Sequence, residues 1–238
     1  MYAEIIAIWG ANGVGKTTTT VNLALALAER NFTVGVISSN LYYGEMQSMF
    51  GCTVTEDRGL YKALTTGETK NMFTQAGKAS VFIMSVPDEF DAMQLTTVSG
   101  VSVKNLLDDA AIRFDYLLID CDTELNNPIS SVGMAEADRI YTVHRPSVKD
   151  CLWYNSMRKM VDLLGIIYKN EPILNGHDKS CDLAEYKSSI GLTFDYEFDF
   201  VDEANIYSNA GKPIMQHDTR RTKGYKYTMR QLASAIIA

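Results

Sequence analysis

The sequence predicts an α/β fold in which a mainly parallel sheet is flanked by helices on both sides. Short apolar runs alternate with segments of helical periodicity along the chain, the order typical of parallel strands joined by helices. A glycine-rich turn follows the first apolar run, residues 5–9, and precedes the first helical segment. A fully apolar run at residues 116–119 ends in Asp120, as expected for a buried strand that ends at a site.

The other elements follow in chain order. After the turn, residues 19–30 carry Leu23 and Leu27 at helical spacing, and Asn31 is expected to end this helix. Further strands are expected at 33–38, 80–85, 139–143 and 173–174, and further helices at 56–66, 104–112, 148–164 and 223–238. The apolar positions of the helix at 148–164 are Leu152, Met157, Met160, Val161 and Leu164, with the methionines expected as core filling. Residues 39–50 are a polar connection at a strand end, and residues 192–201 support no assignment.

Length and composition favour one domain spanning residues 1–238. The chain has 238 residues, of which 46% are hydrophobic, enough to bury a large core. No run approaches the roughly 18 apolar residues of a membrane span, and the N-terminus lacks the pattern of a secretory leader. We therefore expect a cytoplasmic protein.

The cysteines and histidines suggest neither a disulfide framework nor a zinc site. Cys52, Cys121, Cys151 and Cys181 are widely spaced and include no Cys-x-x-Cys pair. The three histidines likewise form no cluster with ligand spacing. The cysteines are interpreted as core thiols.

Residues 10–18 match the pattern of a phosphate-binding loop, a glycine, four residues and then Gly-Lys-Thr, between a strand and a helix. Glycines let the backbone bend around an anion, and the following helix adds the positive end of its dipole. Lys16 is expected to reach the β- and γ-phosphates, Thr17 to hold magnesium through its hydroxyl, and Thr18 to touch the α-phosphate. The plain alternative is a glycine turn with an exposed lysine. The predicted nucleotide-binding residues of the loop are Gly10, Ala11, Asn12, Gly13, Val14, Gly15, Lys16, Thr17 and Thr18.

Asp120 supplies a second signature of a nucleotide site. A carboxylate at the end of an apolar strand is placed to accept hydrogen bonds from the waters of a magnesium ion beside Thr17. Lys16 and Asp120 are therefore the predicted catalytic residues, and Thr17 and Asp120 the predicted magnesium residues. Asp122 could share this role, and the plain alternative is that Asp120 only starts the next loop.

On these residues the chain resembles the ParA/MinD group of P-loop ATPases, which position plasmids, division sites and pili. Four stretches carry the resemblance: Gly-Val-Gly-Lys-Thr-Thr at 13–18, Arg-Gly-Leu-Tyr at 58–61, Arg-Phe-Asp-Tyr-Leu-Leu-Ile-Asp at 113–120, and Gly-Lys-Pro-Ile at 211–214. The resemblance implies a P-loop NTPase fold of the SIMIBI-like class and binding of ATP and Mg²⁺. It also implies a homodimer with a protein partner from a pilus, secretion, conjugation or partition system, and recruitment to a pole, a membrane-associated complex or the nucleoid.

Residues 37–51 look most like the pilus-localising branch of this group, TadZ and CpaE. Members of that branch often carry an N-terminal receiver-like domain, which we do not expect here. Asn175, which follows the apolar pair 173–174, resembles the asparagine of the group that contacts adenine. Its alternative is a turn residue before Gly176.

The chain departs from the group at three positions. The group usually has a signature lysine five residues before the loop lysine, where this chain has Ala11. It also has two aspartates after the second strand, where this chain has Ser38 and Asn40. Loss of a water-positioning acid commonly lowers a rate by about 10² to 10⁴, and loss of a cation removes transition-state stabilisation.

We therefore expect ATP binding with slow or no hydrolysis. The cradle of backbone N–H groups and its charged residues remain, so binding should survive better than turnover. Lys149 or Arg145 could replace the missing lysine.

The C-terminal segment is basic although the net charge of the chain is −7. Residues 218–238 contribute +4, which leaves −11 for the rest. Three interpretations are open: a terminal helix docked on its own sheet, nonspecific DNA binding, and peripheral membrane attachment. Membrane insertion is the weakest of them, because the last turns lack large aromatic residues. The cations concerned are Arg220, Arg221, Lys223, Lys226 and Arg230.

Other classes of ATP-binding protein remain as alternatives. Bacterial tyrosine kinases share the loop but usually have a proline soon after the strand-end aspartate and a tyrosine-rich tail, whereas Cys121 and Asp122 follow here and the tail has only Tyr225 and Tyr227. A metabolic or metal-delivery ATPase is disfavoured by the lack of paired cysteines. A non-hydrolysing ATP-binding scaffold differs from the main hypothesis only in whether turnover matters.

Overall fold

The architecture is an eight-stranded sheet whose neighbouring strands are parallel, with the exception of β3 and β4. The computed structural model describes residues 2–94, 97–177 and 181–238. The strand order is β3-β4-β2-β5-β1-β6-β7-β8. The strands are β1 (Glu4–Gly10), β2 (Val34–Ser38), β3 (Thr74–Gln75), β4 (Val81–Met84), β5 (Tyr116–Asp120), β6 (Arg139–His144), β7 (Asn170–His177) and β8 (Tyr196–Asp199). The predicted α/β fold with a mainly parallel sheet is confirmed.

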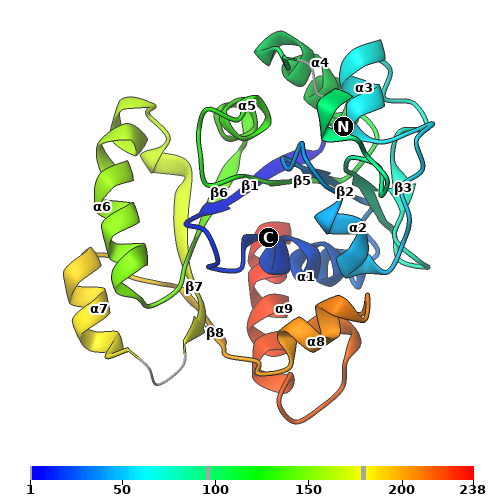
Figure 1. Ribbon diagram of the computed structural model, residues 1–238. Coiled ribbons are helices and arrows are strands. Elements are labelled where there is room, and N and C mark those ends of the chain that lie inside the picture. The colour runs from blue at the N-terminus through cyan, green and yellow to red at the C-terminus, as the bar shows by residue number, and fades with distance from the viewer. Residues whose placement is uncertain (1, 95–96, 178–180) are drawn as a thin grey trace.

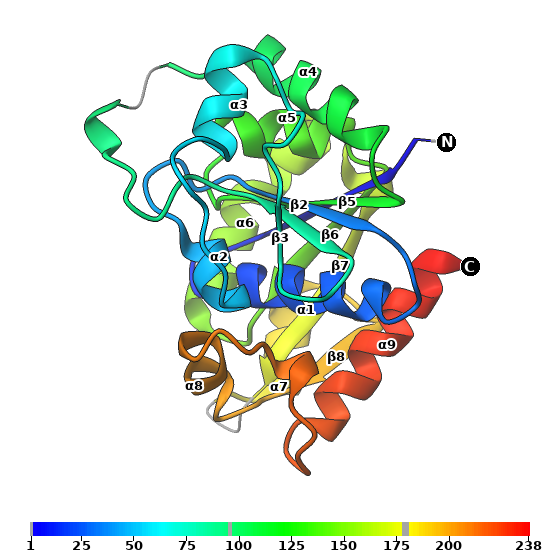
Figure 2. The same cartoon turned by 90° about the vertical axis from the view of Figure 1, so that its right-hand side faces the viewer.

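Alternation along the buried strands divides the core into two layers, one on each face of the sheet. In β1, Ile6 and Ile8 enter one cluster, whereas Ala7 and Trp9 enter the other. Figures 1 and 2 show α1, α2, α8 and α9 on one side of the sheet and α3, α4 and α5 on the other. The helices are α1 (Lys16–Ala28), α2 (Glu45–Phe50), α3 (Leu60–Thr66), α4 (Gly100–Ala111), α5 (Pro128–Glu136), α6 (Val148–Leu163), α7 (Leu183–Ile190), α8 (Ala204–Asn209) and α9 (Lys223–Ile237).

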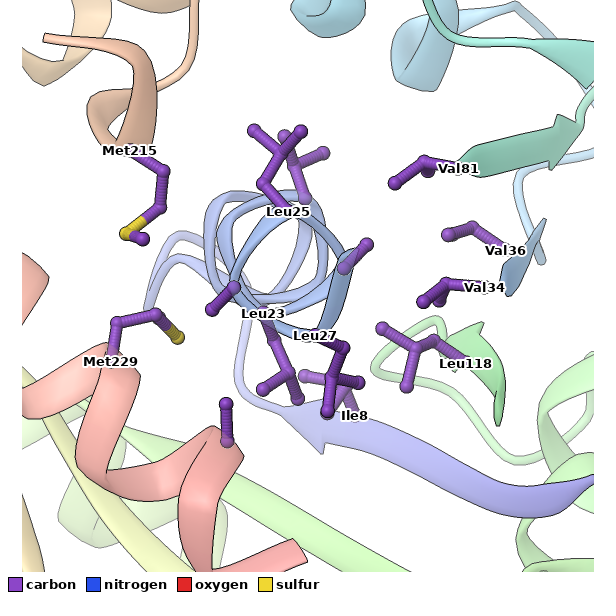
Figure 3. Packing of buried hydrophobic residues seen from close by; sticks show 14 of the residues in the cluster. Ile8, Leu23, Leu25, Leu27, Val34, Val36, Val81, Leu118, Met215 and Met229 are labelled. Atoms are coloured by element: carbon purple, nitrogen blue, oxygen red, sulfur yellow. The ribbon is translucent and has the colours of Figure 1, made fainter. Parts of the chain in front are cut away.

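Helix α1 lies between the sheet and α9, and this position explains its sequence. Its leucines and alanines are buried on both sides, Leu23 against the layer that includes Ile8 and Met229. In Figure 3 the labelled side chains of β1, β2, β4 and β5 surround one flank of α1, and Met215 and Met229 close the other. A helix covered on opposite sides is apolar around most of its circumference.

Helix α6, predicted at 148–164, spans Val148–Leu163, and only part of its predicted apolar face is buried. Leu152 is 67% exposed and Leu164 is 55% exposed, whereas Tyr154 and Val161 are buried. The reason is that α6 packs through Trp153, whose ring lies 4.8 Å from that of Trp9, and through Tyr154, which joins a small cluster with α7. Val161 and Met157 join the same layer as Trp153, whereas Leu152, Met160 and Leu164 are exposed.

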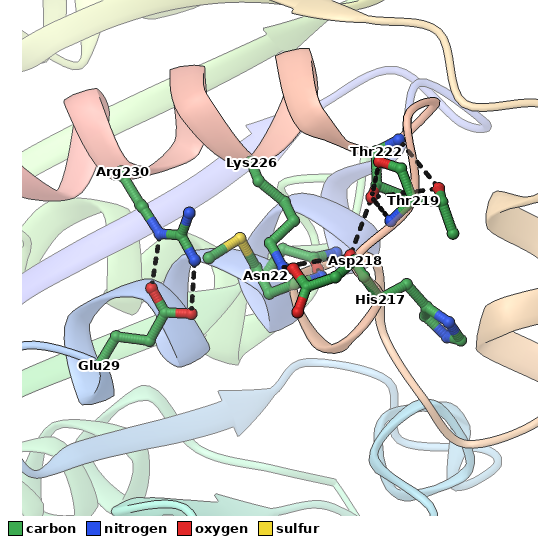
Figure 4. A network of polar contacts seen from close by, with 9 residues as sticks. Asn22, Glu29, His217, Asp218, Thr219, Thr222, Lys226 and Arg230 are labelled. Atoms are coloured by element: carbon green, nitrogen blue, oxygen red, sulfur yellow. Dashed lines mark hydrogen bonds and ion pairs between the residues drawn. The ribbon is translucent and has the colours of Figure 1, made fainter.

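Helix α9 packs against α1 and against the edge strand β8, so the first interpretation of the tail, docking on the chain's own sheet, is met in part. Two of its cations form ion pairs within the chain. Lys226 is only 5% exposed and bonds the carbonyl of His217 at 3.1 Å and Asp218 at 2.5 Å. Arg230 pairs with both carboxylate oxygens of Glu29, at 2.8 and 3.1 Å, and Figure 4 shows both contacts. Helical spacing puts Lys226 opposite the apolar face of α9 and so predicts that it is exposed; this prediction is wrong because its ammonium turns back to the loop before the helix.

Candidate nucleotide site

The predicted phosphate loop joins the C-terminal end of β1 to the first residue of α1, as the motif requires. Gly13 and Gly15 have φ values of 84° and 96°, in the left-handed region that glycine adopts freely. A Cβ on Gly15 would lie 2.2 Å from Nδ2 of Asn175, so glycine is also needed for space. No side chain caps α1, and within the described residues the amides of residues 12–15 donate no hydrogen bond. The loop therefore presents unused donors at the positive end of a helix.

Lys16 lies back across its own loop. Its Nζ donates to the carbonyls of Gly10 and Ala11 at 3.1 and 3.0 Å and to Oγ1 of Thr123 at 2.8 Å. Burial lowers the pKa of Lys16, and the carboxylates of Asp120 and Asp122 act in the opposite direction. An anion in the loop would offer this partly desolvated ammonium a charged partner in place of neutral oxygens.

Asp120 is brought to Thr17 as predicted. Its Oδ2 accepts a hydrogen bond from the hydroxyl of Thr17 at 2.8 Å, and its Oδ1 accepts one from Thr20 at 3.2 Å. Burial raises the pKa of Asp120 to about 6, although Thr17 and the charge of Lys16 act to lower it. Hydroxyl and carboxylate oxygens are the ligands that Mg²⁺ prefers, directly or through water, so this donor set fits the ion.

A cavity of about 610 Å³ opens above the loop. Lys16 is the one cation among the described residues that line it, whereas three acids, Glu45, Asp120 and Asp122, line it as well. The charged side chains that line the cavity are mainly acidic, so a cation such as Mg²⁺ would favour the binding of a polyphosphate there.

A second cavity of about 190 Å³ adjoins the first at residues 13 and 15. Asn175 lines it and donates from Nδ2 to the carbonyl of Val14 at 2.8 Å. Arg145 and Phe200 line it too, with the guanidinium carbon 5.3 Å from the ring centre. Aromatic and amide groups of this kind are typical of a pocket for a planar ring.

Ser38 and Asn40, which stand where the ParA/MinD group has aspartates, serve the turn after β2. Ser38 pairs in register with Asp120, and its hydroxyl accepts from the amide of Asn40 at 3.3 Å. Asn40 Oδ1 accepts from the amides of Tyr42 and Tyr43 at 3.0 and 3.3 Å. Their side chains therefore hold the backbone of this turn.

The two cations considered as replacements for the missing lysine lie on different sides of the loop. Lys149, at the start of α6, donates to the carbonyl of Asn12 at 3.3 Å, on the loop that borders the larger cavity. Arg145 belongs to the smaller cavity. Ala11 is buried, with 1% of its surface exposed, so its side chain contributes only packing while its carbonyl accepts from Lys16.

Thr123 and Glu45 are site residues that the sequence interpretation missed. The Thr123 hydroxyl accepts from Lys16 and lies 2.8 Å from Oδ1 of Asn12 and 3.0 Å from the carbonyl of Gly10. Its only sequence signal is its place three residues after a strand-end aspartate. Glu45 begins a six-residue helix within residues 39–50, where the sequence predicts only a polar connection. Asn205, Ser208 and Asn209 of α8 also line the larger cavity, because α8 packs beside α2.

Three findings concern features that the sequence was expected to lack. All four cysteines are free. In the part of the chain that the structure describes, no group of three or more His, Cys, Asp or Glu residues could hold a metal ion. None of the helices described is both long and apolar enough to cross a bilayer.

Comparisons with known proteins identify a family and a fold. A family model described as "AAA domain" matches residues 3–148, more than half of the chain. The septum site-determining protein MinD of Bacillus subtilis is 24% identical over 176 residues, which cover 73% of this chain and 62% of that protein. The chain thus spans less than two thirds of the length of this relative.

Two solved structures share the fold. MinD of Pyrococcus horikoshii, complexed with Mg-ADP, superposes with a TM-score of 0.81 at 17% identity, over 99% of both chains. A ParA family ATPase of Chlorobium tepidum gives a TM-score of 0.82 at 17% identity, over 98% of this chain and 99% of that one. With its phosphate loop, its strand-end aspartate and the family match, the chain belongs to this AAA-domain family, the ParA/MinD type of P-loop ATPase.

Proposed function

We propose that residues 1–238 form one nucleotide-binding domain that binds Mg-ATP, forms a homodimer and positions or partitions a cellular cargo, with slow or no hydrolysis. The observation that carries the proposal is the meeting of Lys16, Thr17 and Asp120 below a cavity whose loop amides have no partner among the described residues. These groups supply the donors, the cation and the magnesium ligands that a triphosphate requires.

The residues have separate roles in this proposal. The loop amides and Lys16 would hold the β- and γ-phosphates, and Thr18, which lines both cavities, the α-phosphate. The smaller cavity beside Asn175 would take the adenine ring. Mg²⁺ held by Thr17 and the Asp120 carboxylate would supply charge neutralisation for the phosphates.

Slow hydrolysis follows from the absence of a carboxylate at Ser38 and Asn40, whose side chains support the turn. Ala11 also leaves the cavity without a second cation on that side of the loop. Binding depends on neither feature, since the phosphate cradle is formed by other residues.

The proposed dimer would form over the mouth of the larger cavity. Tyr42 and Tyr43 line that cavity and are 62% and 61% exposed, an unusual exposure for two adjacent aromatic side chains. A second copy placed over the nucleotide would cover them.

We place the protein in the cytoplasm, where it would be recruited to a pole, a membrane-associated complex or the nucleoid. The system that it serves would be a pilus, secretion, conjugation or partition system. The finer proposal is that it belongs to the TadZ/CpaE branch.

A nonspecific DNA contact, if this chain makes one, would depend on Arg220 and Lys223. Lys226, Arg230 and Arg221 each pair with a carboxylate within the chain. With two cations at phosphates, a plot of the logarithm of the binding constant against the logarithm of the salt concentration would have a slope of about −2. A salt titration of DNA binding measures that slope.

The test of nucleotide binding is calorimetric titration of the purified chain with ATP and Mg²⁺. Lys16→Ala should weaken binding by more than roughly 100-fold, because it removes a charged contact worth about 3 kcal/mol. Lys62→Ala, which removes an exposed lysine of α3, is the matched control and should bind as the unchanged chain does. Equal affinity in both variants would refute the proposed site.

A further inference from the structure

Glu45 places a carboxylate without a partner in the larger cavity. It is the first residue of α2 and lines the cavity together with Lys16 and Asp120. Its carboxylate makes no hydrogen bond and no ion pair with any residue that the structure describes. Glu45 is exposed to solvent in the first turn of α2, where a negative charge favours the helix dipole, and both of its oxygens remain open to water.

The other two acids of the cavity are engaged. Asp120 accepts hydrogen bonds from Thr17 and Thr20. Asp122 accepts one from the amide of Thr123 at 2.6 Å. Glu45 is thus the one cavity carboxylate, among the described residues, with no hydrogen bond to either of its oxygens.

The position of Glu45 is fixed by the residues that follow it. Met46 is fully buried, and Nε2 of Gln47 donates to the carbonyl of Val86 and to Asp88, both at 2.9 Å. These contacts hold the short helix against the loop after β4. The charge of Glu45 acts on both Lys16 and Asp120, raising the pKa of each, so the carboxylate lies within electrostatic reach of both ends of the phosphate site.

We propose that Glu45 positions the water that attacks the terminal phosphate and accepts its proton, in place of the acids missing at Ser38 and Asn40. This inference rests on the proposed function. The water oxygen forms a bond to the γ-phosphorus as the bond from that phosphorus to the bridging oxygen breaks. The electron pair leaves with ADP, and the water proton passes to the Glu45 carboxylate and then to solvent.

The test combines turnover with binding in the full chain. Glu45→Gln should lower single-turnover phosphate release by at least 10-fold, within the range for removal of a positioned base. The ratio of the affinity for a non-hydrolysable ATP analogue to the affinity for ADP should also rise by roughly 3- to 30-fold, because the variant lacks a negative charge near the γ-phosphate. Glu45→Asp should retain part of the rate. Glu56→Gln, an exposed acid outside both cavities, is the matched control and should change neither quantity.

Each outcome decides the inference. If Glu45→Gln releases phosphate at the unchanged rate and keeps the analogue preference, Glu45 has no such role. If the unchanged chain binds ATP but releases phosphate no faster than the Lys16→Ala variant, the inference is also overturned, while the proposed function stays intact. Failure of the unchanged chain to bind Mg-ATP at all would instead refute the proposed function.

Discussion

The two ends of helix α1 differ in whether their polar groups have partners within the chain. At its C-terminal end Glu29 pairs with Arg230 of α9, and Arg30 donates to Ser234 at 3.0 Å. At its N-terminal end the loop amides are unused, and Asp120 is buried with its pKa raised to about 6. One end satisfies its polar groups within the chain, whereas the other keeps them available, as expected where a ligand completes the structure.

The largest expected effect comes from Gly15→Ala at the N-terminal end. The new Cβ would adopt a positive φ of 96° and meet Asn175 at 2.2 Å, so backbone strain and overlap together should cost about 4 kcal/mol. We expect Mg-ATP binding to weaken roughly 1000-fold in a calorimetric titration. Gly77→Ala also carries a positive φ but meets nothing within 4 Å, so it should lower stability slightly and leave binding unchanged. Equal binding by both variants would show that the loop does not hold the ligand.

Met229→Ala tests the packing at the other flank of α1. Met229 is fully buried beside α1 (Figure 3), and its truncation should lower the free energy of unfolding by about 2–4 kcal/mol. Chemical denaturation measures the loss. Tyr227→Ala, at an exposed position of the same helix, should change stability by less than about 0.5 kcal/mol. A similar loss in both variants would contradict the docked arrangement of α9.

Asp120→Asn tests whether the buried carboxylate is retained for a ligand at the expense of stability. Burial raises the pKa of Asp120 from 3.8 to about 6, so the protonated form is favoured in the folded state. The free energy of unfolding of the ligand-free chain should therefore fall by about 3 kcal/mol as the pH rises from 4 to above 6. Asparagine carries no charge, so near pH 7.5 the free energy of unfolding of the variant, measured by chemical denaturation, should be higher by about 1–3 kcal/mol. Mg-ATP should no longer stabilise the variant. A variant less stable than the parent at pH 7.5 would contradict this account.

The same pKa predicts the pH dependence of Mg²⁺ binding. Above pH 6 the Asp120 carboxylate is ionised, and below it the group takes up a proton. The apparent Mg²⁺ affinity in the presence of ATP should therefore fall about 10-fold for each unit of pH below 6. An affinity that stays constant between pH 7 and 5 would exclude Asp120 as a magnesium residue.

Arg230→Ala should have the smallest effect, although its ion pair with Glu29 is bidentate. The Arg230 and Glu29 side chains are 46% and 38% exposed, and solvent-screened pairs contribute about 0–1 kcal/mol. Denaturation in low and high salt measures this contribution, which should shrink as salt is added. A loss above 2 kcal/mol would mean that the C-terminal end depends on charge as strongly as the N-terminal end.

The parts of the fold that could be predicted are those with strong periodicity or a fixed spacing. The helical spacing of Tyr225, Met229 and Leu232 predicts an apolar face on α9, and all three side chains are buried. The meeting of Thr17 and Asp120 follows from parallel strands whose ends share one edge of the sheet. In both cases local pattern and tertiary packing agree.

The sequence could not reveal contacts that depend on how separate segments meet. The buried face of α6 was predicted from its own periodicity, but Trp153 and Tyr154 face the core because of Trp9 and α7. Likewise, Glu45 reaches the cavity only because Met46 and Gln47 fix α2 beside the phosphate loop. A polar residue in a short helix carries no periodic signal of such a position.

The most direct test of the central claim is one sample studied in three ways: mass by light scattering with and without Mg-ATP, content of bound nucleotide, and release of phosphate. We predict a dimer that retains ATP for hours while releasing phosphate slowly or not at all. Rapid hydrolysis, at a rate typical of relatives that have the lysine and both aspartates, would contradict the account, since Ala11, Ser38 and Asn40 would then have been fully compensated.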